Sequence, residues 1–165
     1  VTCSQAQTLA SNMESGSYTS SLMFGVQWDL VMKYLETKGT AQADLMSDST
    51  SWGNYYNNLW NITNTNSKYA PNGSRWTVGA YGEKASDLSI LLSTGASDTF
   101  SKQGIYDLAG NVWEWTLEYT SDSSSPCALR GGDCIYYGSD YPAANRINDN
   151  TTIYYDDIGF RVSLF

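Results

Sequence analysis

The stretch from residue 40 to residue 104 constrains the fold most, because it is rich in Asn, Ser, Thr and Gly. These residues favour turns, so long helices or strands are not expected there. The same stretch carries Trp52, Trp60 and Trp76, whose large apolar rings should anchor loops onto a core. We therefore predict packed irregular structure in the middle of one domain of 165 residues.

Two helices are predicted before this stretch. Apolar residues at helical spacing predict one helix over residues 4–14, with Ser4 as its N-cap, and a second over residues 26–39. Lys38 and Gly39 should end the second helix. Its predicted core-facing stripe consists of Val26, Leu30, Val31, Tyr34 and Leu35.

Regular strands are predicted near the C-terminus. In residues 111–119, NVWEWTLEY, aromatic and aliphatic side chains alternate with polar ones, so one face of the strand is strongly apolar. The last eight residues, 158–165, alternate in the same way and predict a half-buried strand. The fold class is therefore predicted to be α+β.

The composition excludes several classes of function. Seventeen acidic residues against nine basic give a net charge of -8, which disfavours nucleic acid as a partner. No apolar run approaches the roughly 20 residues that a membrane helix needs, so this segment should not insert into a membrane. The chain has no histidine, which excludes Ser-His-Asp catalysis, Cys-His catalysis and zinc sites built on imidazole.

The three cysteines, Cys3, Cys127 and Cys134, allow at most one disulfide, and none of their spacings is C-x-x-C. A metal or redox motif is therefore not supported. We expect small buried thiols or one optional bridge. The loop from Cys127 to Cys134 is short enough to close, and the sequence leaves this open.

Three motifs in the last third of the chain resemble one family. They are GIYDLAGNVWEW at 104–115, RGGD at 130–133 and IGFRV at 158–162. Together they resemble the formylglycine-generating, or sulfatase-modifying, domain, a variant of the C-type lectin fold. The segment 21–35 stands where that family carries its second helix. The resemblance implies one C-type lectin-like domain over residues 1–165, with two helices, an antiparallel sheet and long irregular loops.

Catalytic members of this family oxidise a substrate cysteine with two cysteines that follow the Arg-Gly-Gly motif. That pair is missing here, since Cys134 comes too early and Tyr141 stands about where the second cysteine would be. The relatives that bind iron through histidine are excluded as well. We therefore predict no enzymatic activity and no required cofactor. The alternative is a copper oxidase of peptide cysteine, with Cys127 and Cys134 displaced to either side of the motif.

A narrower group resembles the end of the chain more closely. The pattern R-G-G-x(5)-G-S-x-x-P-A-x-x-R, followed by a Tyr- and Asn-rich stretch and IGFRV, is similar to the variable proteins of diversity-generating retroelements. Those proteins display hypervariable side chains on this fold, which implies a variable region over residues 119–165. Its predicted ligand-binding side chains are Asp133, Cys134, Ile135, Tyr136, Tyr137, Asp140, Tyr141, Ala144, Asn145, Arg146, Ile147, Asn148, Asp149, Asn150, Ile153, Tyr154, Tyr155, Asp156 and Asp157.

The amino-acid usage of residues 119–165 supports the variable region independently. All five Lys, five Glu, five Gln, four Met and six Trp lie before residue 119. An even scatter would leave the last 47 residues without them on the order of once in a few thousand cases. No pyrimidine-ending codon encodes any of these five amino acids, and adenine-directed mutation of AAY codons produces only such codons. Depletion of Lys and Glu by β-structure is the alternative, but it does not explain the loss of Trp.

The composition of residues 133–157 favours binding over turnover. Five tyrosines stand among Asn, Asp, Ser and Thr, as in antibody loops, although core filling is the alternative for each tyrosine. Acidic residues outnumber the single Arg146, so a basic or donor-rich protein surface is the more natural partner. We expect a protein or other surface ligand whose identity is set by the variable residues. The chain starts at Val1, and we expect it to be the C-terminal part of a longer protein at a phage tail tip or bacterial surface.

A structural calcium ion is the one cofactor that the resemblance suggests. Asp107 and Glu114, with the carbonyls of Gly110 and Val112, match a calcium site of the formylglycine-generating family. Hard oxygen ligands suit calcium. The alternative is that Asp107 caps a turn and Glu114 pairs with a basic residue such as Arg161.

Overall fold

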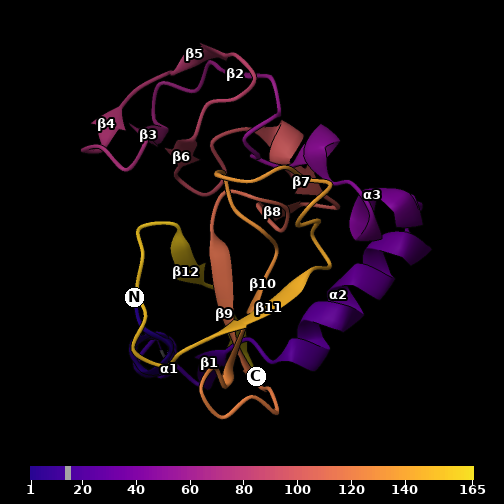
Figure 1. Cartoon of the computed structure of the whole chain (residues 1–165), viewed down its shortest axis with the longest axis vertical. Helices are drawn as coiled ribbons and strands as arrows, with labels where there is room; N and C mark the ends of the chain where they lie inside the picture. Colours follow the sequence, from indigo (N-terminus) through magenta and orange to yellow (C-terminus); the bar gives the residue numbers. More distant parts are fainter. Residues whose placement is uncertain (14–15) are drawn as a thin grey trace.

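The structure is a computed structural model that describes residues 1–13 and 16–165 (Figure 1). Its helices are α1 (Cys3–Ser11), α2 (Gly25–Thr37) and α3 (Gln42–Met46), and two 3-10 turns span Thr50–Trp52 and Asp98–Phe100. Its strands are β1 (Ser20–Leu22), β2 (Trp60–Ile62), β3 (Lys68–Pro71), β4 (Thr77–Val78), β5 (Gly82–Lys84), β6 (Ile90–Leu92), β7 (Ser101–Lys102), β8 (Ile105–Tyr106), β9 (Trp113–Tyr119), β10 (Cys127–Arg130), β11 (Arg146–Asp149), β12 (Ile158–Phe160) and β13 (Val162–Leu164). Within the described residues, no helix is long and apolar enough to cross a membrane. The predicted α+β class is confirmed.

Helix α1 forms where a helix was predicted, but its cap differs. Thr2, not Ser4, is the N-cap: its hydroxyl accepts from the Gln5 amide at 3.2 Å, and the Gln5 side chain accepts from the Thr2 amide at 3.0 Å. These two reciprocal hydrogen bonds satisfy the backbone amides of Thr2 and Gln5, which an N-cap at Ser4 would leave without partners. The helix ends at Ser11, and residue 14 of the predicted helix lies outside the described residues.

Helix α2 ends as predicted, but it buries a different face. Gly39 follows its last turn with a φ of 98°, a conformation that glycine adopts at low cost. The buried residues are Gly25, Trp28, Met32 and Leu35, whereas Val26, Leu30 and Tyr34 of the predicted stripe are exposed. This face is buried because the large indole of Trp28 packs against the guanidinium groups of Arg130 and Arg161.

The central sheet has the strand order β11-β10-β9-β12. Strand β10 is antiparallel to both neighbours, but β12 runs parallel to β9, so the prediction of an antiparallel sheet is wrong at this edge. The single strand predicted over residues 158–165 is also divided in two. Strand β13 leaves the central sheet and pairs with β1. The break falls at Arg161, whose guanidinium turns toward Glu114 and forms an ion pair with it.

Strand β9 shows the predicted alternation, yet both of its faces are covered over its first half. Trp113 and Trp115 pack with α1 in one hydrophobic cluster that also holds Cys3 and Cys127. On the other face, Glu114 is buried against Arg161, and Glu118 lies against Gly25 at the start of α2. In Figure 1, α1 lies at the lower end of the sheet and α2 along its side.

The middle of the chain is irregular as predicted, but it begins with the short helix α3, so the expectation of two helices is wrong by one. Its strands are short and form three small sheets, β2 with β5, β4-β3-β6, and β7 with β8. Strands β2–β6 lie above the central sheet in Figure 1. Trp52 and Trp60 are buried and anchor this part as predicted, whereas Trp76 is 47% exposed. The Trp60 indole donates to Asn54 at 3.1 Å, which ties the segment to the core through a buried amide.

Candidate ligand-binding surface

The predicted variable region begins with a sharp turn at the Arg-Gly-Gly motif. Arg130 is buried at the end of β10, where it pairs with Asp29 of α2. Gly131 and Gly132 follow with φ of 94° and 78°, which side chains other than glycine rarely adopt. A Cβ atom on Gly132 would also collide with the Tyr141 carbonyl oxygen. The motif therefore fixes how the chain enters the loop formed by residues 131–145.

Loop 131–145 is held at one end through its own main-chain atoms. The Trp28 indole donates to the Ala143 carbonyl at 3.0 Å, and the Ala143 amide donates to the Ser49 hydroxyl at 2.9 Å. The next amide, that of Ala144, donates to the Leu45 carbonyl at 2.9 Å. None of these bonds depends on a side chain of the loop.

The other end of the loop is held in the same way. The buried Tyr55 hydroxyl lies 3.1 Å from the Gly131 carbonyl oxygen and 2.9 Å from that of Tyr141. The Tyr56 amide donates to the Tyr136 carbonyl at 2.9 Å. Both partners, Tyr55 and Tyr56, lie in the irregular middle of the chain, so that segment supports the loop.

Lys84 in turn holds the segment that carries Tyr55 and Tyr56. Its ammonium is buried and donates to the carbonyls of Tyr55, Tyr56 and Asn58 at 3.1, 3.0 and 2.7 Å. Burial lowers the pKa of Lys84 to about 8. Sequence reasoning missed Lys84 and Tyr55, because a lysine or tyrosine in a stretch without periodicity gives no sign that it is buried.

The structure divides the predicted ligand-binding side chains by exposure. The exposed ones are Ile135, Tyr136, Tyr137, Asp140, Arg146, Asn148, Asn150, Tyr154, Tyr155 and Asp156. The half-buried ones are Tyr141, Ala144, Asn145, Ile147, Asp149, Ile153 and Asp157. Asp133 and Cys134 are buried. Sequence reasoning did not distinguish these three groups.

Asp133 is buried because it caps the turn that follows it. One oxygen of its carboxyl group accepts from the amides of Ile135 at 2.8 Å and Tyr136 at 3.1 Å. Its second oxygen has no partner except the carboxyl group of Asp157, and we call Asp133 and Asp157 the carboxyl pair. Burial raises the pKa of Asp133 to about 7 and also raises that of Asp157. Burial therefore favours the protonated form of both carboxyl groups.

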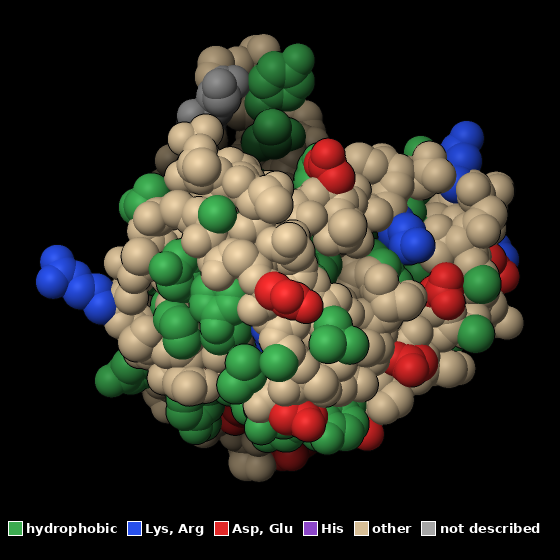
Figure 2. Space-filling view, turned by 90° about the horizontal axis from the view of Figure 1, so that it is seen from above, with side chains coloured by type: hydrophobic (Ala, Val, Ile, Leu, Met, Phe, Trp, Pro, Cys, Tyr) green, Lys and Arg blue, Asp and Glu red, His purple; other side chains and the backbone are tan. Residues whose placement is uncertain are grey.

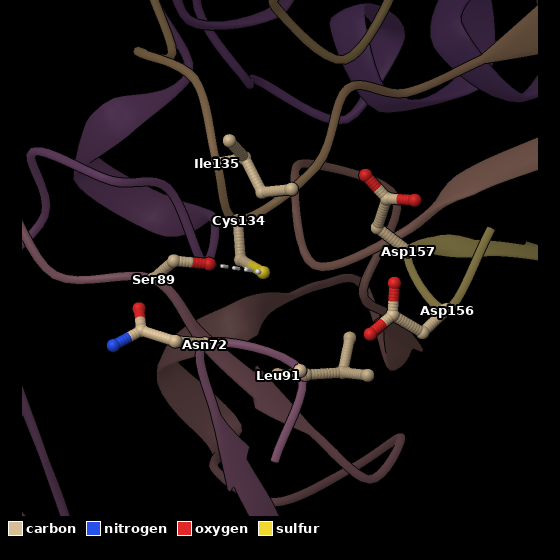
Figure 3. Close-up of a pocket in the computed structure, with 8 residues that line it drawn as sticks. Asn72, Ser89, Leu91, Cys134, Ile135, Asp156 and Asp157 are labelled. Atoms are coloured by element: carbon tan, nitrogen blue, oxygen red, sulfur yellow. Dashed lines mark hydrogen bonds between the residues drawn. The ribbon is translucent and has the colours of Figure 1, made fainter.

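Two cavities meet at Asp157 of the carboxyl pair. The first, of about 310 Å³, lies between the β3 and β6 segments and the variable region, with Cys134, Asp156 and Asp157 on its wall (Figure 3). In it the Cys134 thiol faces the Ser89 hydroxyl at 3.5 Å. The second, of about 180 Å³, we call the aromatic cavity, because Trp113, Tyr136, Tyr141 and Tyr155 line it together with the carboxyl pair.

Figure 2 shows the molecule from above, and Lys and Arg side chains are scattered on this face without forming an extended basic area. Acidic side chains are scattered there among polar and apolar ones. Tyr137 stacks on Tyr56 with ring centroids 6.0 Å apart, and Tyr154 is 71% exposed. The surface thus offers aromatic and hydrogen-bonding groups, with little to attract a polyanion.

Comparison with known families decides the assignment of the scaffold. The model of the Sulfatase-modifying factor enzyme 1-like domain, FGE-sulfatase, matches residues 25–164. The chain belongs to the FGE-sulfatase family. The C-type lectin-like fold inferred from the three motifs is thereby confirmed, and the matched range includes both the supporting segment and loop 131–145.

Among solved structures, Treponema denticola variable protein 1 is similar to this FGE-sulfatase domain. The two are 21% identical with a TM-score of 0.48, and the match covers 87% of this chain. The chain spans about half of that protein, 47% of its length. A comparison with curated protein sequences finds no match.

The cysteines of this FGE-sulfatase domain are buried thiols that lie in two different clusters of the core. All three are free, and Cys127 packs against Cys3, whereas Cys134 packs with Ala70 and Leu91 in another cluster. No disulfide therefore joins Cys127 to Cys134. Burial raises the pKa of both Cys3 and Cys134 to about 12, which disfavours the thiolates that copper would require.

The two side chains proposed for calcium already have other partners. Both oxygens of Glu114 accept from Arg161, as in the alternative that the sequence left open. Asp107 accepts from the Gly95 amide at 2.8 Å, and the same Arg161 donates to its carbonyl at 3.1 Å. Within the described residues, no three His, Cys, Asp or Glu side chains are grouped for metal binding. A calcium ion at this place would have to displace Arg161 from Glu114.

Proposed function

We propose that the chain is a non-enzymatic ligand-binding domain whose residues 119–165 form a surface diversified by adenine-directed mutagenesis. The observation that carries the proposal is the way loop 131–145 is held. Its carbonyls and amides at residues 136, 143 and 144 bind partners outside the variable region, so its exposed side chains can change without loss of these bonds. A fixed backbone with replaceable side chains is what a display surface needs.

The composition of the variable region supports the same proposal. The exposed tyrosines Tyr136, Tyr137, Tyr154 and Tyr155 provide large contact areas at low conformational cost. The absence of Lys, Glu, Gln, Met and Trp after residue 118 agrees with codons that end in a pyrimidine. Exposure of the domain at a phage tail tip or a bacterial surface is part of this proposal, because diversified contacts are useful only where ligands vary.

A pair of randomised libraries tests the proposal. One library varies the codons of five exposed residues, Tyr136, Tyr137, Asn148, Tyr154 and Tyr155, with pyrimidine-ending codons. We expect most members to stay folded, as measured by protease resistance, and some to bind new ligands when selected.

The matched library varies five supporting residues, Trp28, Ser49, Asn54, Tyr55 and Lys84, with codon mixtures that include the native residue at each position, as the exposed library does. We expect most of its members to be unfolded, since buried hydrogen bonds are lost. Equal folded fractions in the two libraries would refute the division into support and display surface.

A further inference from the structure

The aromatic cavity lies within the proposed display surface. Two acidic residues, the buried Asp133 and the half-buried Asp157, line it, and we call them the floor of the cavity. Asp133 is 1% exposed, yet one of its oxygens has no hydrogen-bond donor among the described residues, and one oxygen of Asp157 is in the same state. Buried acceptors without donors are costly, so a donor or cation that reaches them is strongly favoured.

The protein itself supplies no cation to this floor. Among the described residues, the ion pairs of Lys and Arg engage Glu36, Asp29, Glu118 and Glu114, and none engages an aspartate of the cavity. The carboxyl pair instead meets further acidic and phenolic groups. The titratable groups that face it are Asp149 at the end of β11, Asp156 beside it, Cys134, Tyr136, Tyr141 and Tyr155.

The walls above the floor are aromatic and are already arranged edge to face. The rings of Trp113 and Tyr141 have centroids 5.1 Å apart at 72°, and those of Tyr136 and Tyr141 are 4.9 Å apart at 73°. In the described part of the chain, the cation-π contacts of Lys and Arg use Tyr34, Trp28, Trp52 and Trp60, so these walls have no partner of that kind. Aromatic faces around an anionic floor are typical of sites for organic cations.

We infer that the aromatic cavity binds the cationic end of a lysine or arginine side chain from a protein ligand. The ammonium or guanidinium group would lie beside the carboxyl groups of Asp133 and Asp157 that line the cavity, and the methylene groups would contact Tyr136, Tyr141 and Trp113. A volume of about 180 Å³ admits one such side chain rather than a larger structure. The inference rests on the proposed function, because it assigns a ligand class to the same surface.

Cation binding competes with protonation of the carboxyl pair. Burial raises the pKa values of both carboxyl groups and so favours their protonated forms. The cation binds best when the carboxyl groups are ionised. Affinity is therefore expected to rise as the pH increases from 6 to 8.

Titration of the whole chain with small probes tests the inference. The probes are n-butylammonium, n-butylguanidinium and neutral n-butanol, with the shift of the Trp113 indole N–H resonance in NMR spectra as the readout. We expect the two cations to bind in the millimolar range and n-butanol at least tenfold more weakly. Asp157→Asn should weaken cation binding at least tenfold, whereas Glu83→Gln, at an exposed carboxylate on β5 outside the variable region, should not change it.

Three results would overturn the inference: equal binding of n-butanol, unchanged binding in Asp157→Asn, or an affinity that does not rise with pH. A further titration uses calcium chloride as a competitor. Displacement of n-butylammonium by micromolar calcium would show that Asp133 and Asp157 bind a metal ion instead. The pH dependence uses the unmodified chain, so it decides the matter even where Asp157→Asn does not fold. Failure of the cations to bind leaves the library result untouched, so the two proposals fail separately.

Discussion

Replacing Asp133 with Asn should remove a pH-dependent loss of stability from the folded protein. The new amide side chain at this position can keep its carbonyl oxygen on the amides of Ile135 and Tyr136, where Asp133 now accepts at 2.8 and 3.1 Å. Its NH2 group can donate to Asp157. The variant thus retains the hydrogen bonds that hold the turn and no longer titrates at position 133.

The size of the effect follows from the pKa of Asp133, which burial raises from 3.8 to about 7. Below pH 4, Asp133 is protonated in both the folded and the unfolded chain and carries no penalty. Between pH 4 and 7 the unfolded chain loses this proton and the folded chain keeps it, so the stability of the folded state falls as the pH rises. At about 1.4 kcal/mol per pKa unit, the loss reaches at most about 4 kcal/mol and then levels off above pH 7.

The assay is urea unfolding followed by tryptophan fluorescence at intervals from pH 4 to pH 8. The difference in unfolding free energy between Asp133→Asn and the unmodified protein should grow in favour of the variant across this range. Asp140→Asn is the matched control, because its side chain is exposed, and it should follow the unmodified protein. Parallel curves for Asp133→Asn and the unmodified protein would refute the account of the carboxyl pair.

Four further measurements address other parts of the molecule. Tyr154→Ala should change the unfolding free energy by less than about 0.5 kcal/mol while reducing ligand binding, since its side chain is 71% exposed; a larger loss of stability would place it in the core. Lys84→Met should cost more than about 3 kcal/mol in urea unfolding, because three buried carbonyls lose their donor, and a loss below about 1 kcal/mol would contradict the support that we assign to it. Millimolar calcium should leave the melting temperature unchanged, since Arg161 occupies Glu114, and a clear rise would restore the calcium site. Copper(I) titration should find no site made by Cys127 and Cys134, which lie in separate clusters; tight two-thiol binding that is lost in Cys134→Ser would favour the oxidase.

Much of the scaffold was predictable because its signals are local. The alternation in residues 111–119 predicts β9, and the Lys38–Gly39 pair predicts the end of α2. The buried face of α2 was not predictable in this way. It is set by Trp28, whose ring packs against guanidinium groups of residues 130 and 161, more than 100 positions away in the chain.

The candidate site was predictable in extent but not in internal organisation. Composition and motif spacing locate residues 119–165, and they cannot tell which of its side chains support the backbone. Asp133 turns inward because it caps the amides that follow it, and Cys134 packs with Leu91 from a distant strand. The same limitation hides Tyr55 and Lys84, since their partners are main-chain carbonyls that any sequence would provide.

The central claim, that residues 119–165 are a diversified surface, is tested most directly by sequencing the DNA downstream of the gene. The account predicts a near-copy of the segment that encodes these residues, differing from it at adenines of the copy, with a reverse transcriptase gene nearby. The substituted codons should include exposed positions such as Tyr154 and Asn148, and should leave Gly131 and Gly132 unchanged. Absence of such a copy, or differences scattered over the buried turn, would contradict the claim.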